Sequence, residues 1–185
     1  MKLAQSLARW FAGGRARGEA EALYAALAAQ ARRPEPFSEL GVPDSLDGRF
    51  DALCLHMFLV VRRLARDGER GAGLAQDLYD SMFADMDRTL REMGVGDLGI
   101  GKRVTQMAEG LMGRIKAYGD GLDAGQDQLL AAIGRNLFAG AAAADPRALA
   151  RVASYLRASD AALAAQDVGS MLAEGPRFAD WGALP

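Results

Sequence analysis

The sequence predicts an all-α protein, a single-domain helical bundle-like fold with short connections, and three observations lead to this prediction. Valine and isoleucine, which favour strands, are scarce among the 185 residues, whereas alanine, leucine, arginine and methionine, which favour helices, are plentiful. Apolar side chains recur every three or four residues, which is the period of a helix with one buried face. No stretch shows a convincing strand pattern and no segment repeats. A chain of this length forms one compact domain by default.

The first 18 residues form a basic amphipathic segment that differs from the rest of the chain. The segment contains four cations and no acid, and its large apolar side chains fall on one helical face (Leu3, Leu7, Trp10 and Phe11). Such a segment can lie on an anionic membrane surface. The alternative is a terminal helix that docks on the domain or frays. The glycines of residues 13–18 predict a flexible linker after this segment.

Residues 19–174 are expected to form the all-helical domain. Proline and glycine separate its helices, and Asp44 or Ser45 caps the longest one. The middle of that helix, residues 52–61, is apolar nearly all round and must therefore be buried. The expected helices are residues 19–32, 45–66, 74–93, 102–118, 127–138 and 146–165, with breaks at residues 68–73 and 119–121.

The last of these helices has the clearest start. Asp145 precedes Pro146, and proline suits the first position of a helix because its missing N–H would have no partner there. Beyond residue 174 we expect an irregular tail, residues 175–185, from which Phe178 and Trp181 can dock onto the domain.

Composition excludes several classes of function. The net charge of −2 argues against binding of nucleic acid by bulk electrostatics, and we expect no sequence readout of nucleic acid. The one cysteine, Cys54, cannot form an internal disulfide, and the one histidine, His56, cannot form a histidine-pair metal site. We therefore predict no catalytic residue, no metal and no cofactor. No apolar run approaches the roughly 20 residues that a membrane-spanning helix needs.

A glycine-rich run, M-G-V-G-D-L-G-I-G-K-R at residues 93–103, nearly matches two nucleotide-binding patterns. Its first three glycines fit G-x-G-x-x-G. The phosphate-loop pattern fits from Gly96 to Lys102 but fails at Arg103, where a hydroxyl would hold Mg²⁺. Both patterns need a preceding strand, whereas the residues before Gly94 carry a helical stripe. We therefore predict a helix end at Gly94 and a tight connection over residues 94–101. The alternative is a nucleotide- or phosphate-binding enzyme that uses the loop from Gly96 to Lys102.

Methionines flank this run on both sides. Methionine packs adaptably and suits surfaces that accept varied apolar partners, although an ordinary core is the alternative interpretation. Charged residues nearby could fix the turn or form a salt-bridged surface, and His56 could be a hydrogen-bonded core or groove histidine. The candidate client- or partner-binding residues are Met82, Met86, Met93 and Met107, which contribute to or border the client surface, with His56, Asp87, Arg91, Asp97 and Arg103 fixing the geometry around the turn.

Several stretches between residues 19 and 166 match the motifs of one known family. The most specific is D-M-D-R-T-L-R-E-M-G-V-G-D-L at residues 85–98. Others are A-Q-A-R-R-P at residues 29–34, G-V-P-D-S-L-D-G-R-F-D at residues 41–51, and R-N-L-F at residues 135–138. With these motifs the chain resembles the ubiquinol–cytochrome c chaperone family. Its composition, rich in arginine and alanine, resembles the bacterial, proteobacterial branch more than the mitochondrial one.

The resemblance implies a non-enzymatic assembly chaperone for the cytochrome bc1 (ubiquinol–cytochrome c reductase) complex of the respiratory chain. Such a chaperone binds newly made cytochrome b or another bc1 subunit, and the mitochondrial members also work with a small partner protein and the ribosome. A methionine-lined groove could shield one apolar segment of the client by helix-in-groove docking. We expect a cytoplasmic protein, peripheral on the cytoplasmic face of the inner membrane. A membrane-surface adaptor is the alternative.

Overall fold

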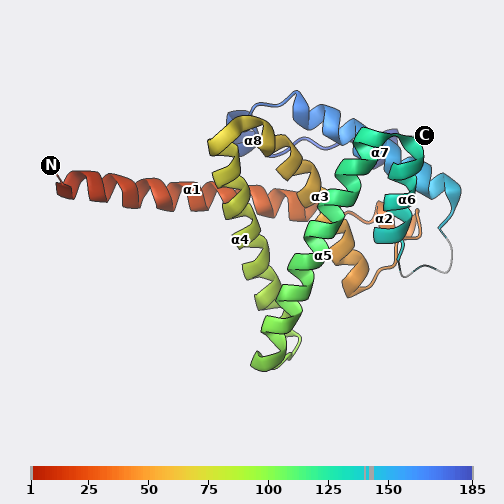
Figure 1. The fold of residues 1–185 in the computed structure, drawn as a ribbon, viewed down its shortest axis with the longest axis horizontal. Helices are drawn as coiled ribbons and strands as arrows, with labels where there is room; N and C mark the ends of the chain where they lie inside the picture. The colour runs from red at the N-terminus through yellow and green to blue at the C-terminus, as the bar shows by residue number, and fades with distance from the viewer. Residues whose placement is uncertain (1, 140, 142–143, 185) are drawn as a thin grey trace.

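The computed structural model describes residues 2–139, 141 and 144–184, with side chains from residue 17 onward. All regular elements in these ranges are helices, which confirms the predicted all-α fold. None of the helices searched in this part of the chain is both long and apolar enough to cross a membrane. Figure 1 shows the arrangement of α1 (Lys2–Ala31), α2 (Glu35–Ser38), α3 (Leu46–Leu64), α4 (Gly68–Glu92), α5 (Asp97–Ala124), α6 (Gln126–Asn136), α7 (Pro146–Ala164) and α8 (Val168–Glu174).

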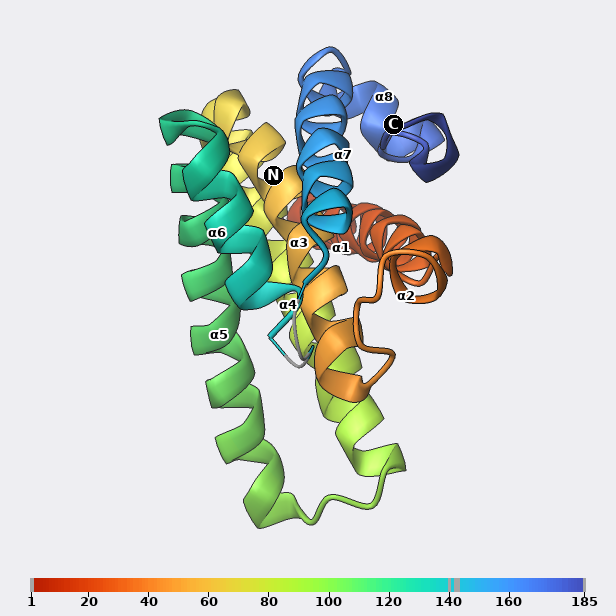
Figure 2. The same cartoon turned by 90° about the vertical axis from the view of Figure 1, so that its right-hand side faces the viewer.

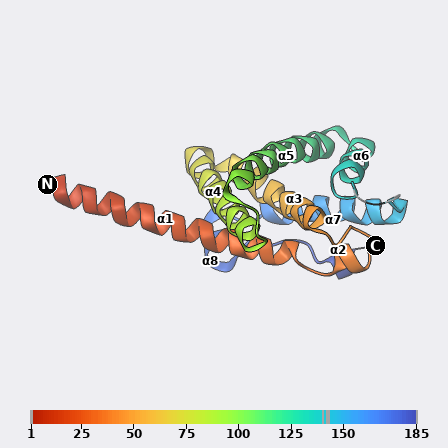
Figure 3. The ribbon, with the colours of Figure 1, turned by 90° about the horizontal axis from the view of Figure 1, so that it is seen from below.

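Helix α1 runs unbroken from Lys2 to Ala31, so the predicted linker at residues 13–18 is wrong. Each glycine inside a helix costs only about 1 kcal/mol relative to alanine, and the alanines and arginines between these glycines favour the helix. The C-terminal half of α1 packs against α3 and α4 and buries Leu23 and Leu27. Figure 3 shows the N-terminal part of the helix reaching beyond the other helices.

Helix α3 is the centre of the bundle. Its N-cap is Ser45, whose side chain accepts a hydrogen bond from the backbone N–H of Gly48 at 3.1 Å, so one of the two predicted caps is correct. Of the predicted apolar run, residues 52–60 are buried and Val61 is half-buried, which largely confirms the prediction. The buried segment packs against α1, α4, α5 and α7, and a short 3-10 turn (Ala65–Asp67) ends the element.

Helices α4 and α5 form an antiparallel hairpin whose tip projects from the body of the molecule (Figures 1 and 2). Both helices are longer than predicted. The break expected at residues 68–73 is limited to Gly68, whose φ of +58° turns the chain, and α4 starts there. The break expected at residues 119–121 is absent because α5 continues to Ala124. Gly121 instead permits a close approach to α6, since a Cβ there would lie 2.9 Å from the Cα of Leu129.

The tip of the hairpin is shorter than the predicted connection of residues 94–101. Gly94 has a φ of +80°, and its N–H donates to the carbonyl of Arg91 while the N–H of Val95 donates to that of Leu90. These two bonds form a Schellman motif, which satisfies the last carbonyls of α4. Gly96 is extended and is the N-cap of α5, so residues 97–101 are already helical.

The C-terminal third of the chain packs against α3 through helix α7. Asp145 caps α7 through the N–H of Arg147, and Pro146 is its first residue, as predicted. Helix α8 was not expected as a separate element. The tail is irregular apart from a short 3-10 turn (Trp181–Ala183), and Trp181 stacks on Tyr155 of α7 with 3.6 Å between ring centroids. The aromatic docking predicted for the tail is therefore present.

Candidate functional site

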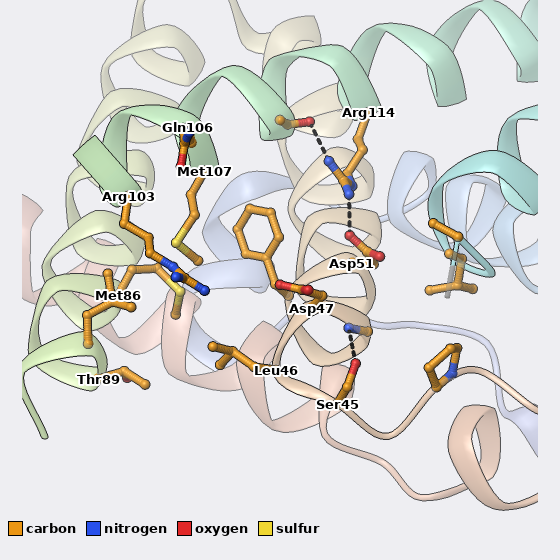
Figure 4. Close-up of a pocket in the computed structure, with 17 residues that line it drawn as sticks. Ser45, Leu46, Asp47, Asp51, Met86, Thr89, Arg103, Gln106, Met107 and Arg114 are labelled. Carbon is orange, nitrogen blue, oxygen red and sulfur yellow. Dashed lines mark hydrogen bonds and ion pairs between the residues drawn. The ribbon is translucent and has the colours of Figure 1, made fainter. Parts of the chain in front are cut away.

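A groove of about 500 Å³ opens between the start of α3 and the α4–α5 hairpin (Figure 4). Its apolar lining comes from three helices that are separate in sequence. The side chains involved are Leu46 and Phe50 of α3, Met86 and Leu90 of α4, and Met107 of α5. Most of them are only partly buried, so they remain available to a bound molecule.

A smaller hollow of about 160 Å³ continues the same surface toward α1, where Ala28 and Ala31 line it. We treat the two hollows as one groove, because both are lined by Leu46, Phe50, Met86, Thr89 and Met107. Four helices therefore contribute to it: α1, α3, α4 and α5. An apolar groove lined by four helices, with a few polar groups, suits a segment of polypeptide better than a small polar metabolite.

A buried ion pair lies in the wall of the groove. Arg114 of α5 contacts the carboxylate of Asp51 of α3 at 2.5 Å, donates to the carbonyl of Gly110 at 3.1 Å and lies over the ring of Phe50 (Figure 4). Burial raises the pKa of Asp51 to about 6, although the nearby Arg114 guanidinium lowers it. The pair therefore joins α3 to α5 and holds a carboxylate that water cannot solvate fully.

The loop before α3 is locked at the floor of the groove by Gly48. A Cβ at this position would lie 1.9 Å from the carbonyl oxygen of Pro43, so only glycine allows the loop to approach. The same approach brings Ser45 into its capping position. The start of α3 and the preceding loop are therefore fixed relative to each other.

The structure places the four predicted methionines in different environments. Met86 and Met107 line the groove, as expected of a surface for an apolar partner. Met82 has no exposed surface and lies in the hydrophobic core, as the ordinary-core interpretation expects, so it can border the client surface but not contact the client directly. Met93 is 57% exposed but lies at the end of α4, outside the groove.

The predicted charged residues near the turn lie in two places, the groove and the tip of the hairpin. Arg103 lines the groove. Arg91 bridges the hairpin tip, because its guanidinium contacts Asp87 at 2.7 Å and Asp97 at 2.6 Å. This bridge joins the end of α4 to the start of α5, so these three residues brace the turn. Since Arg91 and Asp97 are exposed and Asp87 is partly exposed, the bridge adds little to global stability.

His56 is a core residue, and the prediction that it helps to fix the turn is wrong. The side chain is 1% exposed and lies on the side of α3 that faces α7 and the tail. Its Nδ1 lies 2.8 Å from the carbonyl of Ala52 and its Nε2 lies 2.8 Å from the hydroxyl of Tyr155. Burial lowers the pKa of His56 to about 4, so the ring is neutral near pH 7. The alternative interpretation, a hydrogen-bonded core histidine, is correct.

The structure does not give the glycine-rich run the form of a phosphate loop. The element before it is helix α4, not a strand, and Gly101 and Lys102 lie within α5. A phosphate loop instead presents successive free backbone N–H groups before its helix begins. The structural premise of a nucleotide site from Gly96 to Lys102 is therefore wrong.

Sequence reasoning missed part of the groove, namely Leu46, Phe50, Asp51 and Arg114. One available signal was Asp51, a carboxylate at the start of an otherwise apolar buried segment, since such a group needs a cation from elsewhere in the chain. The pairing with Arg114 has no local spacing that could reveal it.

Comparison with known proteins gives a consistent result. The model of the family described as ubiquinol–cytochrome C chaperone matches residues 38–178. A frog protein (Xenopus laevis), ubiquinol–cytochrome-c reductase complex assembly factor 1, is 27% identical over 123 residues, which cover 66% of this chain and 61% of the frog protein. The mouse protein (Mus musculus) of that name is 26% identical over 66% of this chain and 41% of its own length. The chain thus spans less than two thirds of these relatives.

A solved structure covers the fold almost completely. The crystal structure of the Cbp3 homolog from Brucella abortus matches with a TM-score of 0.82 and 29% identity, over 97% of this chain and 99% of that one. The match of the family model extends from α2 into the C-terminal tail and so includes the α3, α4 and α5 walls of the groove. This chain belongs to the ubiquinol–cytochrome c chaperone family.

Proposed function

We propose that this protein is a non-enzymatic assembly chaperone of the cytochrome bc1 complex, and that its groove holds an apolar segment of newly made cytochrome b. The observation that carries the proposal is the open groove of Phe50, Met86 and Met107 in a chain of this family. Relatives of the chain bear the name of assembly factors for the ubiquinol–cytochrome c reductase complex.

The chemistry of the groove suits a client that must be held and then released. Methionine side chains are flexible and polarisable, so Met86 and Met107 can adapt to different apolar side chains. The Asp51–Arg114 pair gives one wall a polar, rigid boundary. A newly made membrane protein exposes apolar surface before its partners arrive, and covering one segment lowers its tendency to aggregate.

The proposal predicts that Met107→Asp abolishes capture of cytochrome b. A carboxylate in the middle of an apolar contact is costly to desolvate even when Arg103, one turn away on α5, pairs with it, and we expect at least a roughly tenfold loss of affinity. The tagged variant is expressed in a strain that makes its own bc1 complex, and co-purified cytochrome b is measured by immunoblot. In a strain without the chromosomal gene, the variant should also fail to restore the b-type haem spectrum.

Met112→Asp is the matched control, since Met112 lies on the same helix, is 47% exposed and does not line the groove. It receives the same charge and should retain normal capture. Equal capture by wild type and folded Met107→Asp would contradict the groove as the client site. A normal bc1 complex in the deletion strain would contradict the assembly function itself.

We also propose that the protein works on the cytoplasmic face of the inner membrane, held there by residues 1–18. The support is the basic composition of this segment together with the projection of the N-terminal part of α1 from the bundle (Figure 3). Vesicles that contain anionic lipid should carry the full chain upward in a flotation gradient, with less binding at high salt. A chain without residues 1–18 should remain at the bottom. Equal flotation of both would refute the role of this segment.

A further inference from the structure

Two charged side chains that line the groove, Arg103 and Asp47, form no ion pair with another described residue. The remaining charges are paired. Three pairs lie in or at the edge of the groove: Asp51 with Arg114, Asp44 with Arg49, and Asp85 with Arg32. Asp47 lies in the first turn of α3, where the helix dipole favours a carboxylate.

Neither of these effects balances Arg103. It lies in the second turn of α5, where the helix dipole gives a cation no benefit, and no carboxylate of the described residues lies within 4 Å of it. Figure 4 shows its side chain extending from α5 into the groove beside Met86 and Met107. The guanidinium is thus presented to whatever occupies the groove.

The spacing of Arg103 and Met107 along α5 further restricts what the groove can bind. The two residues are four apart on α5, so they lie on one face of the helix about one turn apart. A helical occupant along this face can place a carboxylate against Arg103 and an apolar side chain against Met107 with the same separation. Arginine suits this role because its planar guanidinium can bind both oxygens of a carboxylate.

We propose that the groove selects an amphipathic helical segment that carries a carboxylate one turn from a large apolar side chain, and that Arg103 binds this carboxylate. The proposal rests on the proposed function, because it specifies the client segment that the groove accepts. It makes Arg103 a specificity-determining residue, while Met86 and Met107 supply the apolar contact.

The test uses three fluorescein-labelled peptides of roughly 18 residues, about five helical turns, with one leucine stripe. They differ at one position next to the stripe, which holds Glu, Gln or Lys. Fluorescence anisotropy measures their binding to the full-length protein. Wild type should bind the Glu peptide about tenfold more tightly than the Gln peptide, as expected for a charge-assisted hydrogen bond. Arg103→Glu should reverse the order and prefer the Lys peptide.

Lys102→Glu is the matched control, because Lys102 is the exposed neighbouring cation and does not line the groove. It should keep the wild-type order with less than about a twofold change. Equal binding of the three peptides, no binding of any, or an equal loss on Lys102→Glu and Arg103→Glu would overturn the proposal. So would Arg103-dependent flotation with phosphatidylglycerol vesicles without peptide discrimination, since that would assign Arg103 to a lipid headgroup.

The peptide experiment and the test of the proposed function can fail independently. If Met107→Asp loses cytochrome b while wild type does not distinguish the peptides, the groove remains the client site and the role of Arg103 is refuted. If Met107→Asp captures cytochrome b normally, the groove is not the client site, whatever the order of peptide affinities, and the assembly function is decided by the bc1 complex of the deletion strain.

Discussion

Arg114→Leu should destabilise the protein by about 1 kcal/mol near pH 7, because it leaves Asp51 buried without its cation. Leucine retains much of the apolar volume, so the loss reports the charge more than a cavity. Removal of the cation also raises the pKa of Asp51 further, because the Arg114 guanidinium lowers it in the wild type. Urea unfolding at several pH values measures the effect.

The sign of the pH dependence follows from the raised pKa. The folded state binds the proton of Asp51 more tightly than the unfolded state, whose pKa is near 3.8, so stability falls as pH rises from about 4 to about 6. In Arg114→Leu this fall continues to higher pH. The difference between the two proteins should therefore be small near pH 4 and reach about 1 kcal/mol near pH 7, since each pH unit above the wild-type pKa of Asp51 adds about 1.4 kcal/mol.

The control for this prediction is the double variant Asp51→Asn with Arg114→Leu, which has no buried charge at the site. It should recover part of the lost stability near pH 7 and show no difference in pH dependence from Asp51→Asn alone. His56 titrates in all of these proteins and cancels in the comparison. A loss in Arg114→Leu that is the same near pH 4 and pH 7 would show that packing, not the charge of Asp51, causes it.

Gly48→Ala should destabilise the protein by about 2–3 kcal/mol, since the added methyl group meets the Pro43 carbonyl at 1.9 Å. A backbone atom cannot rotate away as a side chain can, so the loop must move and the Ser45 cap must weaken. The loss should appear in thermal or urea unfolding. Because Gly48 lines the groove, capture of the Glu peptide should weaken as well.

Gly73→Ala should change stability in the opposite direction in the same unfolding experiment. Gly73 is exposed within α4, and a Cβ there would have no atom within 4 Å, so alanine should stabilise the helix by up to about 1 kcal/mol. Similar behaviour of the two variants would contradict the close contact between Gly48 and Pro43.

The sequence allowed the fold class and the central helix to be predicted because both depend on local properties. The apolar run of residues 52–61 could only be buried, and Ser45 stands where a cap is needed. The glycine-based predictions failed more often. Most of the glycines of the predicted breaks lie inside helices, where packing offsets their cost of about 1 kcal/mol each. The chain turns at Gly68 and Gly94, where φ is positive, and sequence alone does not reveal φ.

The candidate site was predicted in part for a related reason. Helical spacing placed Met82 and Met86 on one stripe, but it could not show where α1 and α3 would cover that stripe. The groove begins where α1 and α3 no longer cover this stripe of α4. Asp51 and Arg114 are far apart in sequence, so their contact depends on how α5 crosses α3.

Met82 and Met86 are neighbours on α4 that serve different requirements. Replacement of Met82 disturbs the core, so nearly every change there costs stability, whereas Met86 is partly exposed and can change at little cost. The same holds for Met107 and for Arg103. The partly exposed lining at Met86, Met107 and Arg103 can therefore drift during evolution to follow changes in a client, while Gly48, the Asp51–Arg114 pair and the helices that form the frame remain the same.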